Sequence, residues 1–174
     1  DLYDTERLFV PSHDGKKIPI SIMYKKDLFK KNGTNPLYLY GYGSYGLNEK
    51  PEFNVNILTL LDRGFVYAIA HVRGSSFLGY KWYEDGKMFK KMNTFKDFIS
   101  SAEYLINNNY TYKKGITIEG RSAGGLLVGA VMIMRPELFN TVIAGVPFVD
   151  VLNTMCDPSI PLTTPEWKQW GNPN

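Results

Sequence analysis

Short apolar runs that end at glycine or proline recur along this chain. Residues 37–40, 65–70, 115–119 and 142–146 have the length and texture of buried strands. Between them, apolar positions at 54–62 and 95–109 follow a helical spacing, and residues 124–134 form a nearly continuous apolar run. Strands that alternate with helices predict an α/β fold whose sheet is mostly parallel and flanked by helices.

An antiparallel hairpin is expected before this alternation begins. Residues 7–10 form a short apolar run, Asp14-Gly15 is a strong hairpin-turn sequence, and residues 17–24 alternate between apolar and polar positions. Pro19 lies inside the second run and favours an edge position, because proline cannot donate to a sheet ladder. The hairpin therefore predicts an antiparallel edge on the parallel sheet.

Two segments lack a clear period, and a predicted helix-capping residue lies between them. Residues 75–91 combine aromatic residues and glycines without helical spacing, which indicates an ordered loop. Thr94 precedes an apolar stripe in the manner of a helix-capping residue. The chain after Pro147 is rich in proline and is predicted to be loop-like.

Composition and charge exclude several classes of protein. The 174 residues are 44% hydrophobic and 21% charged, as in a single globular domain. A net charge of +3, with the basic residues scattered, gives no face for nucleic acid or membrane. The single cysteine, Cys156, predicts a reducing compartment and hence a cytoplasmic location, and no leader or membrane span is evident. A first residue of Asp suggests a segment of a longer chain.

The pentapeptide Gly120-Arg121-Ser122-Ala123-Gly124 matches G-x-S-x-G. It stands between a predicted strand and a predicted helix, the context in which this motif forms a nucleophile elbow. The turn exposes the serine, and the Ala123 N–H at the start of the helix can stabilise an oxyanion. A glycine-rich turn with a purely structural serine is the alternative.

The loop Gly41–Gly46 also satisfies G-x-G-x-x-G, the dinucleotide-binding fingerprint. That interpretation needs a helix to begin at once, but Pro51 interrupts the residues that follow. In a hydrolase, the loop after an early strand supplies the second oxyanion donor, and the Tyr42 hydroxyl can serve in that role. The hydrolase interpretation is favoured, and a dinucleotide-binding module remains an alternative.

A serine nucleophile needs a base, and no histidine follows Ser122. His13 lies in the hairpin turn and is predicted to be solvated, whereas His71 ends a strand and is predicted to be buried and hydrogen-bonded. Neither fits the order Ser, acid, His expected after an elbow. Two separated histidines and one cysteine also give no metal-ligand spacing, so neither a metal nor a cofactor is expected.

Together these motifs resemble the catalytic domain of the prolyl oligopeptidase family of serine peptidases. The resemblance covers nearly the whole chain, and three of its segments are similar to the oligopeptidase B branch in particular. The general motifs are residues 39–46, 70–74, 120–127 and 134–139, and those of the branch are 14–21, 145–151 and 157–164.

The resemblance implies an α/β-hydrolase fold and a peptidase that cleaves short peptides after Arg or Lys, with a Ser–Asp–His triad beneath a β-propeller. Ser122 would be the nucleophile, with the Ala123 N–H and the Tyr42 hydroxyl as the oxyanion hole. Glu166 and Phe148 would line the pocket for the basic side chain, with Trp167 packed beside them.

Two departures from the family pattern stand out. Lys168 replaces a second acidic residue that is common in the branch, which argues against a preference for basic pairs. The propeller, the triad Asp and the triad His are missing from these residues, so the chain is expected to need other parts of a longer protein as its partner. Alternatively, Glu166 is a solvated loop residue paired with Lys168, and the chain is a truncated, non-catalytic binding module.

Overall fold

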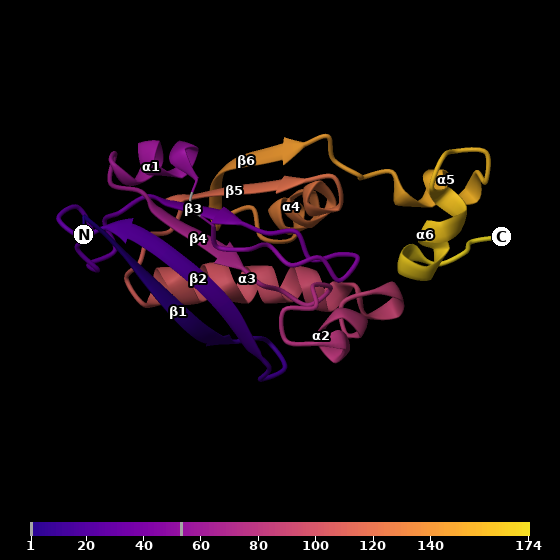
Figure 1. The fold of residues 1–174 in the computed structure, drawn as a ribbon, viewed down its shortest axis with the longest axis horizontal. Helices are drawn as coiled ribbons and strands as arrows, with labels where there is room; N and C mark the ends of the chain where they lie inside the picture. Colours follow the sequence, from indigo (N-terminus) through magenta and orange to yellow (C-terminus); the bar gives the residue numbers. More distant parts are fainter. Residues whose placement is uncertain (1, 53) are drawn as a thin grey trace.

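A computed structural model describes residues 2–52 and 54–174 as a mixed sheet with helices on both faces (Figure 1). The strand order is β1-β2-β4-β3-β5-β6. The strands are β1 (Tyr3–Pro11), β2 (Lys17–Lys25), β3 (Leu37–Tyr40), β4 (Val66–Ala70), β5 (Ile116–Arg121) and β6 (Phe139–Gly145). The helices are α1 (Val55–Leu61), α2 (Tyr80–Glu84), η1 (Met88–Lys90), α3 (Met92–Asn107), α4 (Ala123–Met134), α5 (Val151–Cys156) and α6 (Thr163–Trp170).

The predicted hairpin is confirmed. β1 and β2 pair antiparallel along their full length, and the Ser12 N–H donates to the Lys16 carbonyl across the turn at 2.7 Å. β2 also pairs antiparallel with β4, so Pro19 is not on an edge strand and that prediction is wrong. The carbonyl of Pro19 accepts from the His71 N–H, one residue beyond the end of β4. The Pro19 nitrogen also faces β4, but the paired residues of β2 and β4 begin only at Ile20 and Ala70. The missing N–H of Pro19 therefore removes no hydrogen bond from the sheet.

The parallel part of the sheet is confirmed as well. β4, β3, β5 and β6 run parallel. The chain passes from β3 to β4 toward the β1 edge of the sheet, and from β5 to β6 toward the opposite edge. Alternate strand residues face the helices α3 and α4 and form the core. Its fully buried members include Leu37, Leu39, Ile116, Ile118, Phe98, Leu105, Leu127 and Val131.

The segments predicted as loops contain short helices. α2 and η1 lie within 75–91, where the Trp82 indole donates to the His71 carbonyl and anchors the segment. Thr94 lies inside α3 rather than at its cap, and its hydroxyl donates to the carbonyls of Arg73 and Gly86. After Pro147, α5 and α6 form a pair set off beyond the end of β6 (Figure 1). Among the described residues, none of these helices is long and apolar enough to cross a membrane.

Candidate active site

Ser122 occupies a strained turn between β5 and α4. Its φ is +53° and its ψ is −117°, a conformation that L-residues rarely adopt and that is found where the surrounding structure enforces it. A side chain at Gly120 would lie 2.0 Å from the Gly124 carbonyl oxygen, so the turn closes only with glycine there. The Ser122 N–H donates to the Gly145 carbonyl of β6, which holds the turn while the side chain is exposed. The pentapeptide thus has the backbone geometry predicted for an elbow.

The loop Gly41–Gly46 lies against this turn. A side chain at Gly124 would meet the Gly41 carbonyl oxygen at 2.8 Å and the Tyr42 backbone at 3.3 Å. Burial raises the pKa of the Tyr42 hydroxyl, and an interaction with the Ser122 side chain partly opposes that rise. The Ala123 N–H is the first of α4 and has no acceptor within the helix. Three of the predicted residues, Ser122, Ala123 and Tyr42, therefore meet in one place.

The order of the strands explains this meeting. β3 and β5 are neighbours whose connections depart toward opposite edges of the sheet, and their carboxyl ends carry the Tyr42 loop and the Ser122 turn. Binding sites of open α/β sheets occur at such a switch point. Residues 47–52 are irregular, and the part of the chain that the structure describes has no helix between the loop and α1. The dinucleotide interpretation, which requires a helix there, is wrong.

Phe148 comes from the segment after β6 and reaches the same region. Its N–H donates to the Ser122 carbonyl at 3.0 Å, and its half-buried ring lies 5.4 Å from that of Trp170. Through Trp170, the Ser122 turn is therefore next to α6.

Glu166 is half-buried on α6 and is held by two neutral donors. Its Oε2 accepts from the Tyr45 hydroxyl and from the Trp170 indole, each at 3.1 Å. Within the described residues no donor contacts Oε1, and Lys168 is exposed and forms no ion pair with Glu166. A solvated Glu166 paired with Lys168 is thus not found. Tyr45 and Trp170 are site residues that the sequence reasoning missed; Trp170 lies one helical turn from Glu166 and would follow from a predicted helix.

Trp167 has a different surrounding from the one predicted. Its indole donates to the Met155 carbonyl at 2.9 Å, so it joins α6 to α5. Among the described contacts, none links the Trp167 indole to Glu166 or Phe148, and Trp170 occupies the position beside them.

The histidines behave as predicted and do not serve Ser122. His71 is 3% exposed, its Nε2 lies 2.7 Å from the Ser21 hydroxyl, and its ring stacks on Phe77 at 3.8 Å. Burial lowers the pKa of His71 to about 4. His13 is exposed in the hairpin turn, with Nδ1 3.1 Å from the Ser12 hydroxyl. Neither ring hydrogen-bonds to Ser122 in the described part of the chain.

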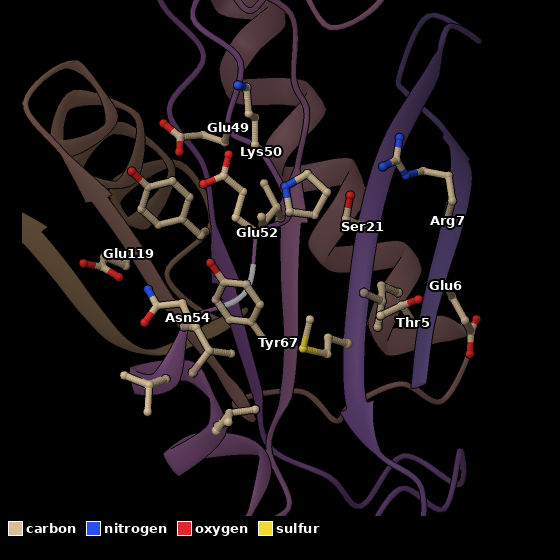
Figure 2. Close-up of a pocket in the computed structure, with 18 residues that line it drawn as sticks. Thr5, Glu6, Arg7, Ser21, Glu49, Lys50, Glu52, Asn54, Tyr67 and Glu119 are labelled. Carbon is tan, nitrogen blue, oxygen red and sulfur yellow. The ribbon is translucent and has the colours of Figure 1, made fainter. Parts of the chain in front are cut away.

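A cavity of substantial size lies away from Ser122. It has a volume of about 1040 Å³ and occupies the face of the sheet opposite the α3–α4 core. Figure 2 shows Tyr67 and Ser21 on its sheet side and Glu49, Lys50 and Glu52 on its loop side. The candidate catalytic residues lie at the exposed turn after β5, and not in this cavity.

Comparison with known proteins decides the family. The profile of the prolyl oligopeptidase family matches residues 51–174. The chain belongs to the prolyl oligopeptidase family. It is 50% identical to dipeptidyl aminopeptidase BI of Pseudoxanthomonas mexicana and 52% identical to protease 2 of Moraxella lacunata. These matches cover 98% and 97% of this chain and 24% of each relative, so the chain spans about a quarter of their length.

Solved structures of this family share the fold. Oligopeptidase B from Leishmania major superposes with a TM-score of 0.95 at 56% identity, and the enzyme from Trypanosoma brucei with covalently bound antipain does so with 0.95 at 55%. Each match covers 99% of this chain and 24% of the other. The predicted α/β-hydrolase fold and the resemblance to oligopeptidase B are confirmed, and the homologues are serine peptidases.

Proposed function

We propose that this chain is the nucleophile-bearing part of a serine peptidase catalytic domain, which hydrolyses short peptides after Arg or Lys through an acyl-enzyme. The observation that carries the proposal is the exposed Ser122 at a φ of +53°, next to Tyr42 and to the Ala123 N–H. The covalently bound antipain in the related Trypanosoma brucei enzyme agrees with a nucleophilic site in this family.

The reaction begins when the Ser122 hydroxyl attacks the scissile carbonyl carbon. A base takes the hydroxyl proton, and the negative charge that forms on the substrate oxygen accepts hydrogen bonds from the Ala123 N–H and the Tyr42 hydroxyl. The carbon–nitrogen bond then breaks, and the base returns its proton to the leaving amine. A water molecule attacks the acyl-enzyme in the same way and frees Ser122. We assign the base and its acid to a later segment of a longer chain, because no histidine follows Ser122 in these residues.

Glu166 supports a preference for a basic residue on the acyl side of the scissile bond. The donors on its Oε2 fix the carboxylate and leave Oε1 to meet a cation. A planar guanidinium binds a fixed carboxylate with two parallel hydrogen bonds, so Arg is favoured over Lys. The Phe148 ring can pack against the aliphatic part of that side chain. Lys168 remains an argument against a preference for paired basic residues.

Replacement of Ser122 by alanine in the full-length protein tests the nucleophile. We expect kcat on an Arg reporter peptide to fall by several orders of magnitude, with loss of labelling by a fluorophosphonate. Ser159→Ala, an exposed serine in the loop before α6, is the matched control and keeps both properties.

Two results would contradict this proposal. A Ser122→Ala protein that still hydrolyses peptide and reacts with the fluorophosphonate would rule out Ser122 as the nucleophile. A wild-type full-length protein that does neither would favour the non-catalytic binding module.

A cytoplasmic location stays a prediction of the sequence. Cys156 is the only cysteine, its thiol is exposed, and no internal disulfide can form. Cell fractionation tests it, and recovery of the protein outside the cytoplasm would contradict it.

A further inference from the structure

Lys91 places an ammonium group between the Tyr42 loop and α6, and within residues 2–52 and 54–174 no carboxylate pairs with it. Its Nζ donates to the Gly43 carbonyl at 2.6 Å and to the Ser44 hydroxyl at 2.8 Å. Burial lowers the pKa of Lys91 to about 7. A part-buried cation without an acidic partner among the described residues is costly, so the contacts of the ammonium must offset that cost.

Both sides of Lys91 belong to the candidate active site. The carbonyl that it holds is that of Gly43, the residue directly after Tyr42. On its other side, Nζ lies 5.3 Å from the centre of the Trp170 ring, within the range of a cation–π interaction. The Trp170 indole in turn donates to Glu166. One ammonium therefore connects the loop of the proposed oxyanion donor with the helix of the proposed specificity residue.

The conformation of the loop depends on this anchor. Gly43 has a φ of +72°, and a side chain there would lie 2.5 Å from the Thr94 methyl group, so the loop is pressed against the start of α3. Lys91 stands just before α3, three residues from Thr94, and Ser44 is fully buried. Without the ammonium, the Gly43 carbonyl and the Ser44 hydroxyl lose their partner and the loop can shift, carrying Tyr42 with it.

We propose that Lys91 is a positioning residue for the hydrolysis reaction, which fixes the Tyr42 hydroxyl at the oxyanion site and packs its loop against α6. This inference rests on the proposed function, because it acts through Tyr42 and becomes visible as turnover only where Ser122 is the nucleophile. Lys91 itself touches neither the substrate nor Ser122 in this role.

A double-mutant cycle in the full-length protein tests the inference. We expect Lys91→Met to lower kcat by at least about 10-fold with KM within about 3-fold, because a misplaced oxyanion donor weakens the transition state and not substrate binding. In a Tyr42→Phe background the same change should lower kcat by less than about 2-fold, because the group that it positions is gone. Lys90→Met is the matched control: Lys90 is the exposed neighbour, pairs with Asp85, and should leave kcat unchanged.

A milder variant covers the case in which Lys91→Met does not fold. Ser44→Ala removes one acceptor of the ammonium and is expected to lower kcat by about 3-fold in the wild-type background and not in Tyr42→Phe. Equal losses in both backgrounds, or a Lys91→Met protein as active as Lys90→Met, would overturn the inference. The Ser122→Ala protein, measured in the same assays, separates the two proposals. If it is inactive, a negative Lys91 result overturns only the role of Lys91. If it stays active, the proposed function itself is overturned.

Discussion

Glu166 is a carboxylate whose position is set by neutral donors, and this makes its charge testable by itself. Replacing Glu166 by glutamine keeps the shape of the side chain and removes the charge. For a peptide with Arg before the scissile bond, we expect kcat/KM to fall by an amount that corresponds to about 2–4 kcal/mol of lost transition-state stabilisation. For a peptide with an apolar residue at that position, we expect a far smaller fall in kcat/KM. Both substrates would be measured on both proteins, with the exposed Glu52→Gln as control. Equal losses on the two substrates would mean that Glu166 does not recognise the basic side chain.

His71 predicts a pH dependence of stability. Its pKa is about 4 in the folded protein and about 6.5 when unfolded, so the unfolded chain binds more protons between these values. Stability is therefore complete above pH 6.5 and is lost as the pH falls toward 4, by at most about 3 kcal/mol. Urea unfolding at pH 7 and pH 5 measures the difference, and His71→Gln should reduce it. The prediction fails if both proteins lose the same stability between the two pH values.

Several residues of the site were beyond sequence reasoning. Ser122, Ala123 and Tyr42 could be predicted because the elbow and the glycine-rich loop have strong local requirements. Lys91 could not, since it is one of three lysines within five residues and its burial is set by Gly43 and Trp170 from distant segments. The resemblance implies Trp167, whereas the place beside Glu166 and Phe148 belongs to Trp170, because α6 turns the two indoles in different directions.

At the scale of elements, a buried ion pair ties the hairpin turn, the end of β4 and α3 together. The Asp97 carboxylate is fully buried, accepts from the Arg73 guanidinium at 2.6 Å and from the Ser12 hydroxyl at 2.5 Å, and Arg73 also pairs with Asp14. Asp97→Asn removes the buried carboxylate charge and leaves the Arg73 guanidinium with the partly exposed Asp14 as its remaining described acidic partner, so it should destabilise the protein by about 3 kcal/mol.

A surface pair provides the comparison for Asp97. Glu103 meets Arg135 with both side chains more than a third exposed, and Glu103→Gln should cost only about 0–1 kcal/mol. Denaturant unfolding of the two variants, followed by tryptophan fluorescence, measures both changes. Similar values for the two would contradict the assigned role of the buried pair.

The elements themselves were predictable where they carry a period. The strands and α1, α3 and α4 follow from apolar runs and helical stripes in the sequence. α2 was missed because five residues carry no period, and its formation depends on the burial of Trp82 beneath β4. α6 was missed because Pro165 suggests a loop, although proline is tolerated in the first turn, where N–H groups have no helical acceptor.

For the whole molecule, the 174 residues alone should be catalytically silent. Ser122 has no base among them, so its hydroxyl remains a poor nucleophile. Incubation of the purified chain with an Arg reporter peptide measures this directly. Hydrolysis at a rate comparable to an intact peptidase would mean that the base lies within these residues.

The isolated chain should also self-associate along β6. In the described sheet β6 pairs only with β5, and its Ile143 is 41% exposed, so an apolar edge is open to a second chain. Ile143→Lys should lower the mass that light scattering measures for the chain. Ile133→Lys, on the exposed side of α4, is the control and should leave that mass at the wild-type value. A wild-type chain that is monomeric at high concentration would contradict this prediction.

The separation of α5 and α6 from the sheet has an evolutionary consequence (Figure 1). The proposed nucleophile lies at the end of a sheet strand, whereas the proposed specificity residue, Glu166, lies on α6. The side chains of Tyr45, Tyr83 and Lys91 connect α6 with the rest of the domain. On these assignments, mutations in residues 151–170 other than Trp170, which contacts Phe148 and Lys91, can accumulate without straining the turn at Ser122. Related proteins could therefore diverge in substrate preference while they keep the same nucleophile and the same turn.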